Sequence, residues 1–180
     1  MNDEQPEGQK AILNLYAALG VSLILSVLPY AAAGVLSLIF FAGVLIAAYV
    51  LRGKVEEHSL SENHATFIIR TLWIGAFFSL ITTVIASAYM LSGIDYSQFQ
   101  PCANDLASRG LEWVENAGMM QVYAVAEPCL DSFLHSNKTL LMNAMIIAGG
   151  PIVIYMAYRM AKGVSRAMKG YRLADAKTWF

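Results

Sequence analysis

Charged side chains are scarce in this chain of 180 residues. Only 14% of the residues are Asp, Glu, Lys or Arg, whereas 57% are apolar and the mean hydropathy is +0.52. Soluble domains usually carry about 25% charged residues. The composition therefore excludes an ordinary soluble domain and predicts an integral membrane protein. The few basic residues form no broad patch, which argues against nucleic-acid binding.

The residue patterns of common enzyme chemistry are also missing. His58, His64 and His135 do not have the i,i+4 spacing of a helical metal pair, and no phosphate-binding glycine loop or nucleophile elbow occurs. No Asp or Glu falls inside the long apolar runs, which disfavours a proton-coupled transporter. We therefore expect a protein that is not an enzyme and that uses no metal or other cofactor.

A basic N-terminal region is absent as well. The chain begins Met-Asn-Asp-Glu-Gln-Pro-Glu-Gly, which is acidic and polar, unlike the start of a secretory signal peptide. We expect residues 1–10 to form an N-terminal tail. The first apolar segment is then expected to stay in the membrane as its own insertion signal.

Four apolar runs are each long enough to cross a membrane, which requires about 20 helical residues. They cover residues 11–28, 30–51, 65–91 and 138–161. The interval at Pro29 is so short that the first two runs are expected to form a tight hairpin. The sequence thus predicts an all-α polytopic membrane protein, in which four transmembrane helices form two hairpins and an exported helical loop separates the arms of the second.

The second run contains small residues that would let a neighbouring helix approach closely. Helix packing is the expected role of this row, rather than the lining of a pore. The residues are Ala31 to Gly34, Ser37, Gly43 and Ala47.

A polar turn at residues 52–62 connects the second and third runs. It ends in Ser59-Leu-Ser-Glu62, a capping-box pattern that predicts a helix start near Leu60. Several residues beyond it recur at spacings of three and four, so they share one helix face that is expected to meet a neighbouring helix or lipid. These residues are Asn63, Thr66, Arg70 and Trp73, with His64 beside them.

Arg70 stands inside the third apolar run, where its charge needs an explanation. In one interpretation the side chain reaches along its aliphatic stem to the membrane surface, with Trp73 in the aromatic belt. In the other it pairs with Glu56, Glu57 or Glu62 of the turn, or binds a lipid phosphate. The sequence leaves both interpretations open.

The polar loop at residues 92–137 is long enough to have structure of its own. Two short amphipathic helices are expected, one capped at Asn104 or Asp105 and one opened by Pro128. Cys102 and Cys129, the only cysteines, both lie in this loop. If the loop is exported, a disulfide closing about 28 residues would stabilise it by roughly 3.5 kcal/mol. Two buried free thiols are the alternative.

The fourth run contains Gly149, Gly150 and Pro151 near its middle, and the proline predicts a helix kink because it removes a backbone hydrogen bond. Residues 162–180 are expected to form a basic amphipathic tail. Its stripe would contact anionic lipid on the cytoplasmic side, and pairing with the acids of the 52–62 turn is the alternative. The stripe consists of Arg159, Lys162, Arg166 and Lys169.

Lys10, Arg52, Lys54, Arg70 and the basic residues after the fourth run lie near one set of span ends, whereas Arg109 and Lys138 lie near the other. The positive-inside rule then predicts that both termini are cytoplasmic and that the 92–137 loop lies on the opposite side of the membrane. An even number of spans, such as four, places both termini on the same side of the membrane.

His64 lies shortly before an Ile-Arg-Thr-x-Trp-Ile block, and a Thr-Trp pair lies near the C-terminus. The stretches concerned are Glu62-Asn-His64, Ile69-Arg-Thr-Leu-Trp-Ile-Gly75 and Ala176-Lys-Thr-Trp-Phe180, together with Ala48-Tyr-Val-Leu-Arg52. In these stretches the chain resembles a family of small bacterial inner-membrane proteins of unknown function. That family is sometimes grouped with the chloroplast inner-envelope translocon channel proteins. The resemblance implies a helical membrane fold and a location in the bacterial inner membrane, and it implies no activity.

The chain departs from that family at two places. It lacks the prolines usual before the terminal Trp, and the long cysteine loop replaces a short link. The loop suggests a protein partner in the periplasm. We therefore expect a non-enzymatic accessory or scaffolding subunit of a larger inner-membrane assembly. The alternative is a channel or carrier component, for which Gly149 to Pro151 and the polar face at Arg70 are the evidence; association into a homo-oligomer is compatible with either.

Overall fold

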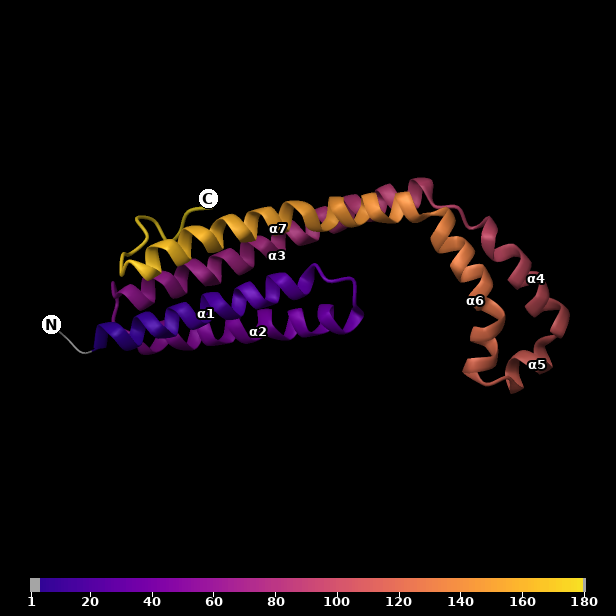
Figure 1. Cartoon of the computed structure of the whole chain (residues 1–180), viewed down its shortest axis with the longest axis horizontal. Helices are drawn as coiled ribbons and strands as arrows, with labels where there is room; N and C mark the ends of the chain where they lie inside the picture. The colour runs from indigo at the N-terminus through magenta and orange to yellow at the C-terminus, as the bar shows by residue number, and fades with distance from the viewer. Residues whose placement is uncertain (1–3, 180) are drawn as a thin grey trace. The chain divides into compact units, whose positions relative to one another are not determined.

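A computed structural model describes residues 4–179, and within this range the regular secondary structure is entirely helical (Figure 1). The chain divides into two units. Unit 1 takes in the described residues up to Ile81 and from Gly149 onward, and unit 2 is Thr82–Ala148, so that α3 and α7 contribute to both. The elements are α1 (Glu4–Ser26), α2 (Ala31–Lys54), α3 (Leu60–Gly93), the 3-10 helix η1 (Ser97–Phe99), α4 (Gln100–Arg109), α5 (Leu111–Asn116), α6 (Met119–Ser136) and α7 (Lys138–Met168).

In the described part of the chain, four helices are long and apolar enough to cross a membrane. They are Gly8–Ser26, Ala31–Lys54, Leu60–Gly93 and Lys138–Met168. The expectation of an all-helical chain with four such helices is confirmed. At 34 residues, α3 is about 50 Å long, which exceeds the roughly 30 Å hydrocarbon core of a bilayer. Tilt or protrusion of α3 from the bilayer follows from its length.

Helices α1 and α2 pack against each other within unit 1 (Figure 1). Ser22 and Ser37 connect them, because each hydroxyl donates to the other residue's carbonyl oxygen at 2.9 Å. Both serines are buried. Since hydrocarbon offers no hydrogen-bond partner, this reciprocal pair favours one register between the two helices.

The face of α2 that is buried differs in part from the row of small residues predicted from the sequence. Ala33 and Ser37 of that row are buried, but Gly43 and Ala47 are exposed. The buried face continues through Val44 and Ala48 instead. The reason is the helical period, which rotates Gly43 and Ala47 away from the side on which Ser37 lies.

The capping pattern at the start of α3 is confirmed in one of its two bonds. The Ser59 hydroxyl oxygen accepts the backbone N–H of Glu62 at 3.1 Å, and α3 begins at Leu60. The Glu62 carboxylate makes other contacts: it accepts the Thr66 hydroxyl at 2.9 Å and lies 3.7 Å from Nε of Arg52. Glu62 therefore connects the end of α2 to the first turn of α3.

Helix α7 runs from Lys138 to Met168 with Pro151 inside it, so the helix continues beyond residue 161, where the fourth apolar run ends. The basic segment forms the last turns of this helix rather than a separate surface helix. A Schellman motif ends α7: the N–H groups of Gly170 and Tyr171 donate to the carbonyls of Ala167 and Arg166, both at 3.0 Å. Gly170 has φ +69°, which favours glycine. The kink predicted at Gly149, Gly150 and Pro151 stays a prediction.

Unit 2 contains the three helices of the loop together with the adjoining ends of α3 and α7 (Figure 1). Helix α4 packs against both α5 and α6. Pro128 lies inside α6 rather than at a helix start, so that part of the prediction is wrong. Residues Met119 to Ala126 form the first half of α6.

The buried apolar core of unit 1 draws on all four of its helices and on the chain after α7. Close approach is required where α7 meets α1, because a β-carbon at Gly163 would collide with the Tyr16 side chain. The principal core residues are Ile12, Tyr16, Leu19, Val44, Ala48, Phe67, Ile68, Tyr155, Met156, Ala167 and Leu173.

We predict that Ala48→Leu destabilises the protein, because Ala48 is 0% exposed and a larger side chain must displace its neighbours. Overpacking of this kind costs about 1–3 kcal/mol. Ala47→Leu is the matched control, since Ala47 is exposed on α2. Thermal unfolding of both variants in one detergent measures the difference, and equal midpoints would contradict the assignment of the buried face.

Candidate functional site: a buried polar network and the C-terminal segment

Arg159 of α7 is the largest fully buried side chain of the described residues. Its Nε donates to the Thr71 hydroxyl at 3.0 Å, and its Nη1 donates to the Thr178 carbonyl at 2.8 Å. Its Nη2 lies 3.5 Å from the Phe67 carbonyl, and Cζ lies 3.8 Å from the centre of the Phe67 ring. The guanidinium is therefore held by one face of α3, where Phe67 and Thr71 are one turn apart, and by the chain beyond α7.

Within residues 4–179, the oxygens that accept from this guanidinium are neutral. Within residues 4–179, the ion pairs join Arg52 to Glu62 and Arg109 to Asp105, and neither includes Arg159. Hydrogen bonds of a charged donor and an aromatic face each stabilise a buried cation, although neither neutralises it. The network consequently depends on oriented carbonyl and hydroxyl dipoles rather than on a salt bridge.

The C-terminal segment, defined here as residues 171–179, returns along unit 1 after the Schellman motif. Asn63 of α3 binds both polar groups of Leu173: Oδ1 accepts the Leu173 N–H at 2.8 Å, and Nδ2 donates to the Leu173 carbonyl at 3.2 Å. Asn63 and Leu173 are 7% and 5% exposed. One amide side chain thus replaces the two hydrogen bonds that a neighbouring strand would supply.

His64 binds the same segment two residues before Leu173. Its Nε2 lies 3.1 Å from the Tyr171 carbonyl and its Nδ1 lies 3.0 Å from the Tyr16 hydroxyl. A carbonyl can only accept, so Nε2 carries the proton and, in the neutral ring, Nδ1 accepts from Tyr16. His64 therefore connects α1, α3 and the C-terminal segment through one ring.

Further contacts hold the ends of α1 and of the segment. Gln9 of α1 donates to the Ala167 carbonyl at 2.8 Å, at the last turn of α7. The Trp179 ring meets the Phe78 ring edge to face, with centroids 6.4 Å apart. Since Leu173 lies at Asn63 and Trp179 lies at Phe78, the segment runs along α3 in the direction of α3.

The predicted polar face of α3 splits into buried and exposed parts. Asn63, His64 and Thr66 are buried, whereas Arg70 is half-buried and Trp73 is 58% exposed. Trp73 Nε1 donates to the Tyr49 hydroxyl of α2 at 3.1 Å. Of the three acids that were candidate partners of Arg70, Glu62 pairs with Arg52 instead. The structure thus brings Asn63 and His64 to the C-terminal segment and places Trp73 at the α2 interface.

The predicted lipid contact of Arg159 is wrong, because a side chain with 0% exposure has no surface for a headgroup. Arg166 and Lys169 are exposed, and Lys162 is half-buried with Nζ 5.9 Å from the centre of the Tyr158 ring. Contact of these three residues with anionic lipid stays a prediction.

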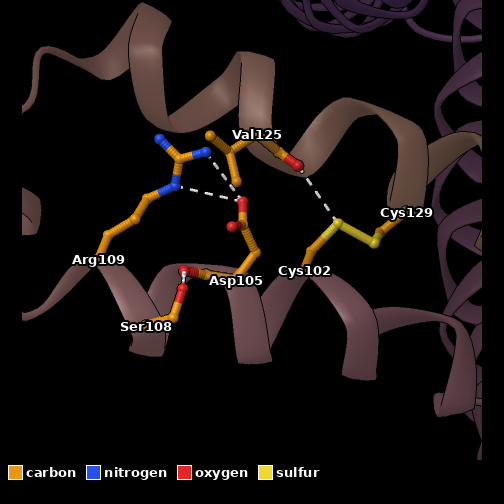
Figure 2. A network of polar contacts seen from close by, with 6 residues as sticks. All are labelled: Cys102, Asp105, Ser108, Arg109, Val125 and Cys129. Atoms are coloured by element: carbon orange, nitrogen blue, oxygen red, sulfur yellow. Dashed lines mark hydrogen bonds and ion pairs between the residues drawn. A yellow bond between two sulfur atoms is a disulfide. The ribbon is translucent and has the colours of Figure 1, made fainter.

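Cys102 of α4 and Cys129 of α6 form a disulfide in unit 2, with Cα atoms 6.2 Å apart (Figure 2). The Val125 carbonyl oxygen lies 3.2 Å from Cys102 Sγ. This approach is a contact rather than a hydrogen bond, because a disulfide sulfur has no proton to donate. One turn further along α4, the Asp105 carboxylate accepts two N–H groups of Arg109 at 3.2 and 3.1 Å.

Asn137 ties the two ends of the loop together. Its Oδ1 accepts the Asp95 N–H at 2.9 Å, and its Nδ2 donates to the Asp95 carbonyl at 3.0 Å. The Asp95 carboxylate in turn accepts the Ser97 N–H at 2.9 Å, and this hydrogen bond lowers the pKa of Asp95. Asp95 is therefore ionised near neutral pH, which favours the turn into η1.

A hollow of about 320 Å³ lies between α2, α3 and α7 in unit 1 and is lined by Leu38, Phe41, Ala42, Leu45, Leu72, Trp73, Gly75, Ala76, Ser79, Ile152 and Met156. Another, of about 420 Å³, is an open polar hollow in unit 2 lined by Gln98, Asp131, Ser132, His135 and Ser136. Across residues 4–179 no group of three or more His, Cys, Asp or Glu side chains could hold a metal ion.

Sequence reasoning missed Arg159, Thr71 and Tyr16 as members of the network. A signal for Arg159 existed, because it follows Tyr155-Met-Ala-Tyr158 inside the fourth apolar run, as Arg70 lies inside the third. Its spacing with Lys162 and Arg166 suggested a surface stripe instead. Thr71 and Tyr16 carry no such signal, since an isolated hydroxyl in an apolar helix is common.

We predict that Arg159→Ala lowers the free energy of unfolding by at least about 2 kcal/mol, because it removes hydrogen bonds of a buried charged donor. Arg70→Ala is the matched control and should cost about 0.5 kcal/mol, the usual effect at a partly exposed position without a bonded partner among residues 4–179. Thermal unfolding in one detergent compares the two variants. Equal losses would contradict the central role assigned to Arg159.

Comparisons with known proteins do not identify a relative of this chain. No protein-family model, no curated protein and no solved structure matches it. The resemblance to the small inner-membrane family stays a prediction, and the assignment of the site rests on the geometry described above.

Proposed function

We propose that this protein is a non-enzymatic accessory or scaffolding subunit of a larger assembly in the bacterial inner membrane. In this proposal the four long helices anchor the chain as two hairpins, and unit 2 contacts a protein partner in the periplasm. The buried network stabilises the anchor rather than performing chemistry. The resemblance to the small inner-membrane family supports this location.

One observation carries the proposal: unit 2 exposes apolar side chains on a framework that a disulfide constrains. Met119 and Met120 at the start of α6 are 88% and 78% exposed, and Tyr123 one turn later is 50% exposed. The Cys102–Cys129 disulfide joins α4 to the other half of α6. Exposed Met and Tyr on a constrained helix are typical of protein-interaction surfaces.

The charge distribution supports an orientation with both termini in the cytoplasm. Basic residues of unit 1 include Arg52 and Lys54 at the end of α2 and Arg166 near the end of α7. In this orientation the exposed Arg166 and Lys169, with Lys162, lie at the anionic cytoplasmic surface. The disulfide then lies in the oxidising periplasm, where such bonds persist.

A channel or carrier component is the second candidate, and the proline inside α7 is the observation that favours it. Broken or bent helices line the binding sites of many transporters. Against this candidate, Asn63, His64 and Arg159 already hydrogen-bond the C-terminal segment. Polar side chains committed in this way do not line an open path.

We predict that a photocrosslinking amino acid at Met120 captures a protein partner in intact cells, whereas the same group at Glu115 does not. Glu115 is the control because it is also exposed but lies on α5, outside the apolar surface. Crosslinks to lipid alone at Met120 would contradict the partner proposal. Purification in mild detergent then separates the candidates, since a large complex supports the scaffold and a lone conducting oligomer supports the channel.

We predict that a periplasm-specific reporter is active when inserted near Ser97 and inactive when fused to the C-terminus. The reason is that Lys10, the basic residues of the 52–62 turn and the basic residues from Arg159 onward lie at the same set of helix ends. A cytoplasm-specific reporter at the same two positions is the control and should give the opposite pattern. Activity of the periplasmic reporter at the C-terminus would contradict the proposed topology.

A further inference from the structure

We propose that α3 and α7 form a peptide-binding site in unit 1, and that its ligand is the chain's own C-terminal segment, bound detachably. The proposal does not depend on the scaffold function. It assigns Asn63, His64 and Arg159 a shared role, which is the recognition of an extended main chain.

The first step of the argument is what these side chains touch. Each binds main-chain groups of the segment: His64 contacts the carbonyl of Tyr171, Asn63 binds both polar groups of Leu173, and Arg159 donates to the carbonyl of Thr178. None of these contacts uses a polar side chain of the segment. The site therefore recognises the main chain of the segment rather than its side chains, as the edge of a sheet does when a peptide strand is added to it.

The second step concerns which side chains of the segment are covered. Leu173 is 5% exposed and packs in the apolar core, and Trp179 meets Phe78. Arg172, Ala174, Asp175 and Lys177 are exposed. Leu173 is thus the buried apolar anchor that fixes the register. Ala176 packs partly buried against the same core, and the Trp179 ring meets Phe78 while remaining 48% exposed.

The third step is that the segment has little structure of its own. After the Schellman motif at Gly170 no helix forms, and the internal bond found between Asp175 and Lys177 is a local turn, with the Lys177 N–H donating to Asp175 Oδ1 at 2.8 Å. Its main chain depends on α3 and α7 for hydrogen bonds. A segment of this kind behaves as a tethered ligand, whose occupancy follows from a local concentration in the millimolar range.

The receptor side, in contrast, is held in place without the segment. His64 is oriented by Tyr16, and Arg159 by Thr71 and the Phe67 ring. Asn63 lies in the first turn of α3, directly after the Ser59 cap. Because these contacts lie among the helices, the binding groups keep their geometry when the segment leaves, as preorganised sites do.

Two variants of the full chain, one with a change at Leu173 and one at Ala174, test whether the segment is bound to α3 and α7. Trypsin cleavage after Arg172 should be about tenfold faster in Leu173→Ser than in the parent protein, because the buried anchor is lost and the Leu173 amide is freed. Ala174→Ser, next to it and exposed, should leave the rate unchanged. Equal rates in the two variants would overturn the anchor role of Leu173 and with it the site.

A second experiment tests detachability. A specific protease site inserted between Gly170 and Tyr171 allows the segment to be cut off and washed away in detergent. A fluorescent peptide of sequence Tyr-Arg-Leu-Ala-Asp-Ala-Lys-Thr-Trp should then bind saturably, and binding should fall at least about tenfold with a Leu-to-Ser peptide or with an Asn63→Leu protein. Intact helices that do not bind the peptide would overturn the proposal. Loss of helicity on cleavage would overturn it too, since the segment would then be part of the core rather than a ligand.

Discussion

Arg159 carries a charge at a position where neither water nor a carboxylate of residues 4–179 reaches it. A buried cation is costly unless its donors are satisfied, and here the acceptors come from three places in the chain: Thr71, Phe67 and Thr178. α3 supplies two of these acceptors, and the C-terminal segment supplies the third when it is bound. The segment therefore completes the set of acceptors around Arg159, although it forms no regular secondary structure.

The same solution to main-chain hydrogen bonding appears twice. The Asn63 side chain hydrogen-bonds the N–H and the carbonyl of Leu173 in unit 1, and the Asn137 side chain does the same with Asp95 in unit 2. In both cases a buried asparagine near a helix end binds the N–H and the carbonyl of an irregular segment. Backbone that leaves a helix loses its internal partners, and an amide side chain restores both at once. Asn63 and Asn137 thus each hold a non-helical segment of the chain against a helix.

The two units differ in how their polar and apolar groups are distributed, and this difference underlies the functional proposals. Unit 1 places its unusual polar residues inside, where they bind the chain itself. Unit 2 places Met119, Met120 and Tyr123 outside, on a helix that a disulfide ties to α4. A stabilised anchor with an apolar surface on a constrained loop is the arrangement expected of a subunit that is held in a membrane and contacts another protein.

The sequence by itself determined the number of long apolar helices and the helix start at Leu60, and it limited any disulfide within the chain to Cys102 and Cys129. Each of these depends on local composition, on a capping pattern a few residues long, or on there being only two cysteines. Tertiary structure alone decided that Arg159 is buried and that Gly43 and Ala47 face outward. It also decided that residues 171–179 lie along α3. The physical reason is that spacing along a helix specifies which residues share a face, whereas the partner of that face is specified by segments more than a hundred residues away, as Leu173 is from Asn63.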